Sequence, residues 1–154
     1  MRRTEQEIIN KTEIEDILNR ATICRLGLSI DNVPYIVPLN YGYKDNCLFF
    51  HCAKEGKKLE IIRQNNNICF EIDIDSDIKK SDSPCKWSAR YKSIIGFGKA
   101  YVIADKEEKL KGLDVIMSHY SNESTFEYNE KSVENVLIIK VVIDEMTGKK
   151  TSDS

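Results

Sequence analysis

Three consecutive residues that follow an apolar run have the types and the spacing of a phosphate-binding site. The run from Cys47 to Phe50 stops at His51, and Gly56, Lys57 and Lys58 come soon after it. We expect Gly56 to open a helix, because glycine permits a close backbone approach and the two lysines then lie in the first turn. The unpaired N–H groups and the positive dipole end of that turn, together with the lysine charges, favour a dianionic phosphate ester. The alternative is a surface helix whose lysines are solvated after a tight turn.

Alternating apolar residues and turn residues predict that mainly strands position this motif. We expect strands over residues 23–30, 34–43, 47–53, 68–74, 91–104 and 136–143. Asp31-Asn32 and Lys44-Asp45-Asn46 favour hairpins between the first three of them. A polar insert over 75–86 interrupts the pattern, and Gly96 and Gly98 within a strand imply a bulge, a bend or a close backbone contact. Six strands with a few helices fit a small closed barrel.

Three helices complete this expectation. Thr12 and Glu15 form a capping-box pattern before a short helix that ends near Arg20. The second helix starts at Lys57, and the third follows a cap at Asp105. The spacing of the third helix predicts an apolar face made of Leu110, Leu113, Met117 and Tyr120.

Four sequence blocks occur in an order that resembles a known family. The blocks are PYIVPLNYGY (34–43), FFHCAKEGKKL (49–59), KSIIGFGKAYV (92–102) and a closing strand that ends in TGK (147–149). Together they resemble the 5-nitroimidazole-resistance (Nim) reductase group of the FMN-binding split-barrel superfamily, whose members are similar to pyridoxamine-phosphate oxidases. The likeness spans nearly the whole chain and implies a six-stranded antiparallel split β-barrel, mainly β with flanking helices. It is specific for the fold and the flavin, and weak for the substrate.

Length, charge and cysteine content fit this expectation. A chain of 154 residues can bury a sufficient core, and we expect one FMN-binding domain over residues 1–154, with a polar, frayed tail after Gly148. The net charge of −2 gives no general signature of nucleic-acid binding. Five cysteines without a C-x-x-C pair indicate reduced thiols. No segment reads as a signal peptide or as the ~18 apolar residues of a membrane span, so we expect a soluble cytoplasmic protein.

An FMN site would divide its tasks among three groups of residues. FMN needs a phosphate anchor, a slot for its ring and donors near the edge of that ring. Lys57 and Lys58 would supply the anchor, and the resemblance favours Lys58. The residues that we expect beside the ring are Pro38, Leu39 and Asn40 on one strand, His51, Cys52 and Ala53 on the next, and Ser93 and Ile94 from either subunit.

Three of the candidate residues have open roles. His51 stands where Nim-type proteins have a His beside the flavin, so it could hydrogen-bond the cofactor or substrate, or supply a proton. Asn40 lies in an apolar strand, so its amide must face solvent, a ligand or a backbone partner. Trp87 is either an anchor for its own loop or an aromatic contact across a dimer interface. In the second case we expect it to help bind the cofactor, near a second wall for the flavin ring that one subunit offers the other with Ile94, Ile95 and Phe97.

The resemblance implies a homodimer that binds FMN at the subunit interface and reduces small nitroaromatic or nitroimidazole-type molecules. One alternative is a module that binds flavin or haem without turnover, with His51 or His119 as an axial ligand. A single-strand nucleic-acid binder is disfavoured, because the residues that alternate from Tyr35 to Tyr43 include no Lys or Arg. A metal site is also disfavoured, because adjacent His51 and Cys52 point to opposite faces of a strand. The C-terminus has no Arg-x-His motif, which argues against vitamin B6 oxidation.

Overall fold

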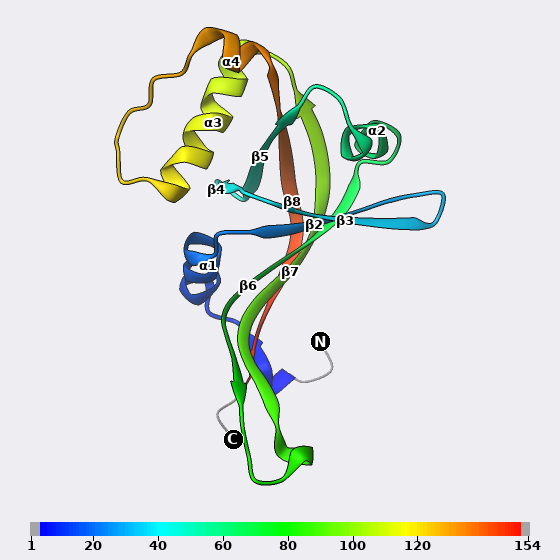
Figure 1. The fold of residues 1–154 in the computed structure, drawn as a ribbon, viewed down its shortest axis with the longest axis vertical. Helices are drawn as coiled ribbons and strands as arrows, with labels where there is room; N and C mark the ends of the chain where they lie inside the picture. The colour runs from blue at the N-terminus through cyan, green and yellow to red at the C-terminus, as the bar shows by residue number, and fades with distance from the viewer. Residues whose placement is uncertain (1–3, 152–154) are drawn as a thin grey trace.

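Antiparallel strands dominate the computed structural model, which describes residues 4–151 (Figure 1). The strands are β1 (Glu7–Ile8), β2 (Cys24–Ile30), β3 (Val33–Leu39), β4 (Gly42–Lys44), β5 (Cys47–Ala53), β6 (Asn67–Lys79), β7 (Ser88–Ile103) and β8 (Val136–Lys150). The helices are α1 (Lys11–Arg20), α2 (Lys57–Gln64), α3 (Lys106–Tyr120) and α4 (Glu130–Glu134), with 3-10 turns η1 (Thr4–Gln6) and η2 (Pro84–Lys86). The sheet order is β3-β2-β6-β7-β8-β5-β4, and β1 pairs with β8.

The sheet closes into a barrel because its two end strands are consecutive parts of one segment. β3 pairs with β2, whereas β4 pairs with β5, and only Asn40 and Tyr41 separate β3 from β4. The predicted strand over 34–43 is therefore two strands that pass from one neighbour to the other. With β3 and β4 counted as one, six strands form the barrel in the described residues, and β1 is an addition that the sequence did not indicate. The predicted fold class, mainly antiparallel β with flanking helices, is confirmed.

Two predicted hairpin turns are confirmed by their backbone angles. Asp31 and Asn32 have φ values of 50° and 61°, and Asp45 and Asn46 have values of 50° and 58°. Two consecutive left-handed residues match the twist of a tight hairpin, and Asp and Asn tolerate this conformation better than most residues.

The barrel interior forces close contacts at the two glycines of β7. A Cβ at Gly96 would lie 2.3 Å from the ring of Phe70, which is buried in the core. A Cβ at Gly98 would lie 2.2 Å from the carbonyl oxygen of Val142 on β8. The register between β7 and β8 shifts between Phe97 and Gly98. The predicted bulge and close backbone contact are therefore confirmed.

β6 and β7 extend past the barrel as a two-stranded arm, which we define as residues 75–90 (Figure 1, bottom). The prediction of a polar insert over 75–86 is wrong for its first part, because β6 continues to Lys79 and pairs there with Ser88. Most side chains of the arm are exposed, so its sequence lacks the alternation that marks a half-buried strand. Asp75, with φ 56°, lies at the register shift where the arm leaves the barrel.

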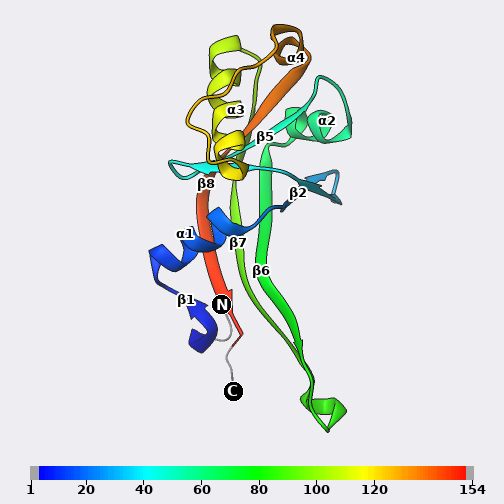
Figure 2. The ribbon, with the colours of Figure 1, turned by 60° about the vertical axis from the view of Figure 1, so that its left-hand side comes forward.

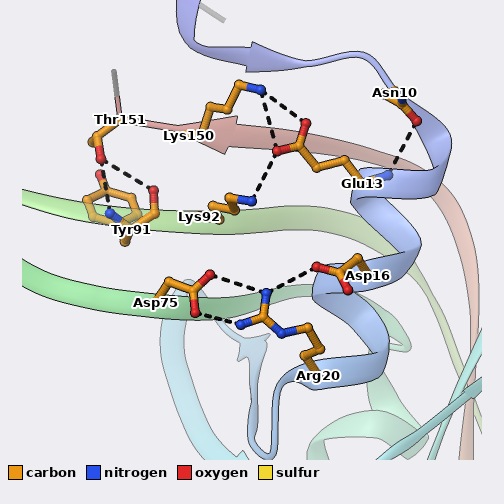
Figure 3. Close-up of polar contacts among 9 residues, drawn as sticks. All are labelled: Asn10, Glu13, Asp16, Arg20, Asp75, Tyr91, Lys92, Lys150 and Thr151. Carbon is orange, nitrogen blue, oxygen red and sulfur yellow. Dashed lines mark hydrogen bonds and ion pairs between the residues drawn. The ribbon is translucent and has the colours of Figure 1, made fainter. Parts of the chain in front are cut away.

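Ion pairs join the base of the arm to α1 (Figure 3). Arg20 contacts Asp75 at 2.7 Å, and Glu13 contacts Lys92 at 3.3 Å and Lys150 at 3.1 Å. These pairs connect α1 with β6, β7 and β8 at the base of the arm.

The C-terminal strand runs further than predicted. β8 continues to Lys150, so the prediction of a frayed tail after Gly148 is wrong as far as that residue. At Thr151 the hydroxyl accepts a hydrogen bond of 3.0 Å from the N–H of Tyr91. The rest of the predicted tail, residues 152–154, lies outside the described part of the chain.

Two helix predictions need correction. Asn10 caps α1, with its side-chain oxygen 2.8 Å from the N–H of Thr12, so the cap lies before the predicted one. The cap of α3 at Asp105 is confirmed, but its buried face consists of Lys109, Gly112 and Ile116 and differs from the predicted face. Gly112 explains the difference, because a Cβ there would lie 2.9 Å from Ile138, and this close approach decides which side of the helix meets the sheet. Within residues 4–151, no helix is long and apolar enough to cross a membrane.

Candidate functional site

The turn between β5 and α2 leaves the first turn of the helix open, as the sequence predicted. Gly56 is the N-cap of α2, with φ 135° and ψ 162°, and no side chain caps the helix. Only glycine adopts this conformation without strain. Nothing lies within 4 Å of a Cβ placed on Gly56, so the surface beside the helix start is open to a ligand.

The two lysines of this turn differ in their surroundings. Lys57 is exposed, and its Nζ lies 4.8 Å from the centre of the Tyr35 ring on β3. Lys58 is half-buried, and its charge offsets part of the rise that burial causes in the pKa of the Cys52 thiol. Neither lysine forms an ion pair with a described carboxylate, so both charges are available to an anion.

We define the split in the barrel as the place where the chain passes from β3 to β4, at Asn40 and Tyr41. The first three residues predicted to lie beside the flavin ring are at or next to this split. Pro38 and Asn40 are exposed, and Leu39 is half-buried. β4 pairs Gly42 with Phe49, so two further steps along this register bring Asn40 opposite His51, where the ladder has ended. Asn40 therefore faces solvent or a ligand, in agreement with the expectation for an amide in an apolar strand.

His51 and its two neighbours alternate across β5. The side chains of His51 and Ala53 are exposed, whereas Cys52 is buried. Burial raises the pKa of the Cys52 thiol, and the charges of Lys58 and Arg63 offset this effect only in part. The thiol therefore stays protonated near neutral pH and is a poor nucleophile. Only the backbone of Cys52 can face a ligand on the outer surface.

The side chains of two predicted residues on β7 are buried. Ile94 is fully buried in the core, so only its backbone could face a ligand, and its place beside the flavin stays a prediction. Ser93 is also buried, at 7% exposure. Ile95 and Phe97 point outward instead and are about half exposed, at 49% and 50%. A shift by one residue changes the face of the sheet, and the apolar sequence around Ile94 does not reveal which residues point outward.

Trp87 lies at the tip of the arm, far from α2. The view in Figure 2 places the tip of the arm and α2 at opposite ends of the molecule. The indole Nε1 donates a hydrogen bond of 2.6 Å to the carbonyl of Ser81, and Lys80 lies 6.0 Å from the ring centre. Trp87 thus anchors its own loop, and it cannot reach Lys58 of the same chain. A contact across a dimer interface stays a prediction.

The outer face of the sheet carries an exposed apolar strip, which we define as Ile95, Phe97 and Tyr101 on β7 and Val142 on β8. Neither Tyr101 nor Val142 was singled out from the sequence. Arg25 on β2 was also missed; it pairs with Pro38 in register and holds Glu71 at 2.9 Å and Asp73 at 2.5 Å. Burial raises the pKa of Glu71, although the Arg25 guanidinium opposes this rise.

The linings of two surface cavities include no residue of α2. One, of about 490 Å³, lies beside α3 and is lined by residues that include Tyr43, Phe49 and His119. The other, of about 610 Å³, lies at the base of the arm beside Tyr91 and Lys92. Asn40, His51 and the lysines of α2 line neither of these two cavities.

Comparisons with known proteins identify the family. The family model described as pyridoxamine 5′-phosphate oxidase matches residues 10–150. This chain belongs to the pyridoxamine 5′-phosphate oxidase-like split-barrel family. Its split-barrel fold agrees with this membership, and the resemblance found in the sequence is confirmed. Among curated proteins, none is significantly similar to the chain.

Three solved structures are similar to this split-barrel protein. A candidate 5-nitroimidazole antibiotic resistance protein from Bacteroides thetaiotaomicron is 37% identical, with a TM-score of 0.82, and the match covers 94% of this chain and 86% of that chain. The flavocytochrome Anf3 from Azotobacter vinelandii is 15% identical, with a TM-score of 0.85 and coverage of 99% and 72%. An FAD and haem binding protein from Mycobacterium smegmatis is 18% identical, with a TM-score of 0.85 and coverage of 96% and 74%. The last two share the fold alone.

Proposed function

We propose that this split-barrel protein binds FMN and uses it to reduce small nitroaromatic molecules of the nitroimidazole type. The observation that carries the proposal is the open helix start at Gly56, where Lys57 and Lys58 form no ion pair with a described carboxylate. The similarity to the Bacteroides thetaiotaomicron protein supports the substrate class.

The α2 turn suits the terminal phosphate of FMN. A dianionic monoester gains from the uncapped N–H groups, from the helix dipole and from two lysine charges at once. The FMN monoester carries two negative charges on one phosphate group, whereas each phosphate of the FAD diphosphate carries one, so the proposal favours FMN.

The split in the barrel suits the ring of the cofactor. Asn40 can donate to or accept from the polar edge of the ring, and exposed Pro38 offers an apolar edge beside it. A bound flavin supplies the redox chemistry. His51 is exposed and can hold the proton that reduction of a nitro group consumes, which makes it our candidate catalytic residue.

A second copy of this chain would complete the site. The surface around Asn40 and His51 is open, whereas a bound ring is usually enclosed on more than one side. The apolar strip on β7 and β8 is an exposed surface of the kind that subunits bury. The arm is a two-stranded hairpin with Ile78 and Trp87 about half exposed, at 54% and 49%, and such hairpins are marginally stable alone. We therefore propose a homodimer in which Trp87 of one subunit approaches the split of the other.

The first test is the optical spectrum of the purified protein. We expect a yellow sample, or micromolar binding of added FMN detected by quenching of its fluorescence. After the bound FMN has been reduced by one equivalent of dithionite without oxygen, we expect its electrons to pass to an added nitroimidazole, so that the yellow colour of oxidised FMN returns as the nitro group is reduced. Absence of FMN binding at that concentration rejects the proposal. Binding without nitroimidazole reduction leaves a flavin-binding module without this activity.

Haem binding is the second candidate function. His51 is the better axial ligand, because its side chain is exposed while Nε2 of His119 donates a hydrogen bond of 2.6 Å to the carbonyl of Ala21. A Soret band that appears on addition of haemin and is lost in His51→Ala would favour this function over the first.

A further inference from the structure

The split in the barrel contains a side chain where a rung of the strand ladder is expected. The β2–β3 ladder pairs Leu26 with Val37 and then Cys24 with Leu39, where it stops. Continuing the same register by two residues would pair Thr22 with Tyr41. These two residues do not bond to each other directly.

The hydroxyl of Tyr120, the last residue of α3, stands between them. The N–H of Tyr41 donates to the Tyr120 hydroxyl oxygen at 2.9 Å, and that hydroxyl donates to the carbonyl of Thr22 at 2.7 Å. A direct rung would join the same N–H and carbonyl by one hydrogen bond of about 2.9 Å. Two hydrogen bonds in series replace one, so the strands stand apart at this position.

A hydroxyl is chemically suited to this position because it accepts one hydrogen bond and donates another. Both backbone groups are thereby satisfied without closure of the ladder. Tyr41 is fully buried, and loss of the hydroxyl removes the acceptor that its N–H has in this structure. The N–H then loses this protein partner or forms a direct rung to Thr22, and both change the geometry of the split.

Further contacts hold Tyr120 in this place. The hydroxyl of Tyr41 donates to the carbonyl of Leu18 at 2.6 Å, and Nε2 of His119 donates to the carbonyl of Ala21 at 2.6 Å. The His119 ring lies 4.6 Å from the Tyr41 ring and 4.7 Å from the Tyr120 ring. The end of α3 is thus fixed to the segment that joins α1 to β2.

We propose that Tyr120 is a positioning residue that keeps the barrel split open at Asn40 and Tyr41. Asn40 directly precedes Tyr41 in the chain. Continuation of the β4–β5 register places Asn40 opposite His51. Tyr120 therefore acts on the cofactor through the backbone that presents Asn40, without touching the ligand. We call the Tyr120 hydroxyl between the Tyr41 N–H and the Thr22 carbonyl the wedge. Its effect on the ligand rests on the proposed FMN function, whereas the wedge itself does not.

The test compares Tyr120→Phe with Tyr128→Phe. Tyr128 is a matched control because its hydroxyl also makes a side-chain hydrogen bond, of 2.8 Å to Asp114, away from the split. In the protein without ligand, we expect the Tyr41 amide to exchange with solvent at least about tenfold faster in Tyr120→Phe only, because its hydrogen-bond acceptor is gone. FMN and riboflavin should both bind about tenfold more weakly, since the ring position and not the phosphate is disturbed.

Three results keep the wedge and the function separate. Wild-type amide exchange at Tyr41 in Tyr120→Phe, without the new cross-strand NOE contacts to Thr22 that a direct rung would give, overturns the wedge, whether or not FMN binds. Faster exchange of the Tyr41 amide with unchanged flavin affinity overturns the positioning role. In that case the substitution has only lowered the stability of the fold, which lowers Tm and leaves the affinity of the folded protein for flavin unchanged. Failure of the wild type to bind FMN rejects the proposed function, while the exchange measurement still decides the wedge. If Tyr120→Phe does not fold, the wild-type NMR spectrum decides: the wedge requires NOE contacts from the Tyr120 ring to the Tyr41 amide, and their absence overturns it.

Discussion

Replacement of Lys58 by alanine tests the phosphate anchor most directly. Lys58 is half-buried at the open start of α2 and has no described carboxylate partner, so its charge is available to a phosphate. A charge-assisted hydrogen bond contributes about 1.5–3 kcal/mol, which corresponds to roughly a 10- to 150-fold weaker affinity for FMN. We expect a value toward the lower end, because Lys57 and the uncapped N–H groups remain and solvent screens the site.

The contrast between two ligands isolates the phosphate. Riboflavin has the same ring and no phosphate, so its affinity should change little in Lys58→Ala. The assay is quenching of flavin fluorescence at fixed ionic strength, with Lys44→Ala as a control, because Lys44 is an exposed lysine of β4 outside the α2 turn. Lys57→Ala should have a smaller effect, because Lys57 already lies over the Tyr35 ring. An equal loss for both ligands in Lys58→Ala refutes the anchor and assigns Lys58 to the fold or the ring pocket.

Three further predictions concern the dimer, the arm and the bulge. FMN should shift the protein toward dimer in sedimentation velocity, and Trp87→Ala should weaken this shift; a stable monomer with one full equivalent of flavin contradicts the shared site. The Lys150 ammonium, with Lys92 beside it, holds the pKa of Glu13 below its ordinary value of 4.5. The ion pairs therefore stabilise the fold above pH 4.5, and this stabilisation is lost as the pH falls through the lowered pKa. Chemical denaturation should therefore show Glu13→Gln as less stable than the wild type at pH 7, with the difference shrinking in acid; a constant difference would argue against the ion pair. Gly98→Ala should destabilise by about 2–4 kcal/mol, because its Cβ would overlap a carbonyl of β8, and a loss below about 1 kcal/mol would show that the bulge adapts.

Local backbone preferences account for the parts of the fold that the sequence predicted. Asp31-Asn32 and Asp45-Asn46 adopt left-handed turns that their own side chains favour, and Asp105 caps α3 through its own oxygen. Gly56 opens α2, and Gly98 marks a bulge. Each of these features depends on a residue and its near neighbours, so the sequence alone was sufficient to place them.

The arm and the outward face of β7 required the tertiary structure. The arm is exposed on both faces, so its sequence does not alternate between apolar and polar residues. For this reason the sequence predicted a strand that ends before β6 does. Ile94 and Ile95 are both apolar, and only the register with β6 and β8 decides which one enters the core.

The shape of the candidate site is a matter of long-range contacts. The sequence by itself determined the helix start that carries Lys57 and Lys58, because glycine and lysine at that spacing act locally. It could not show that Tyr120 lies between Thr22 and Tyr41, residues 98 and 79 positions away along the chain. Nor could it show that Trp87 lies at the far end of the molecule from α2. Residues so distant in sequence come together or stay apart only through packing of the whole barrel, and one tyrosine hydroxyl at the end of α3 then decides where the strands separate.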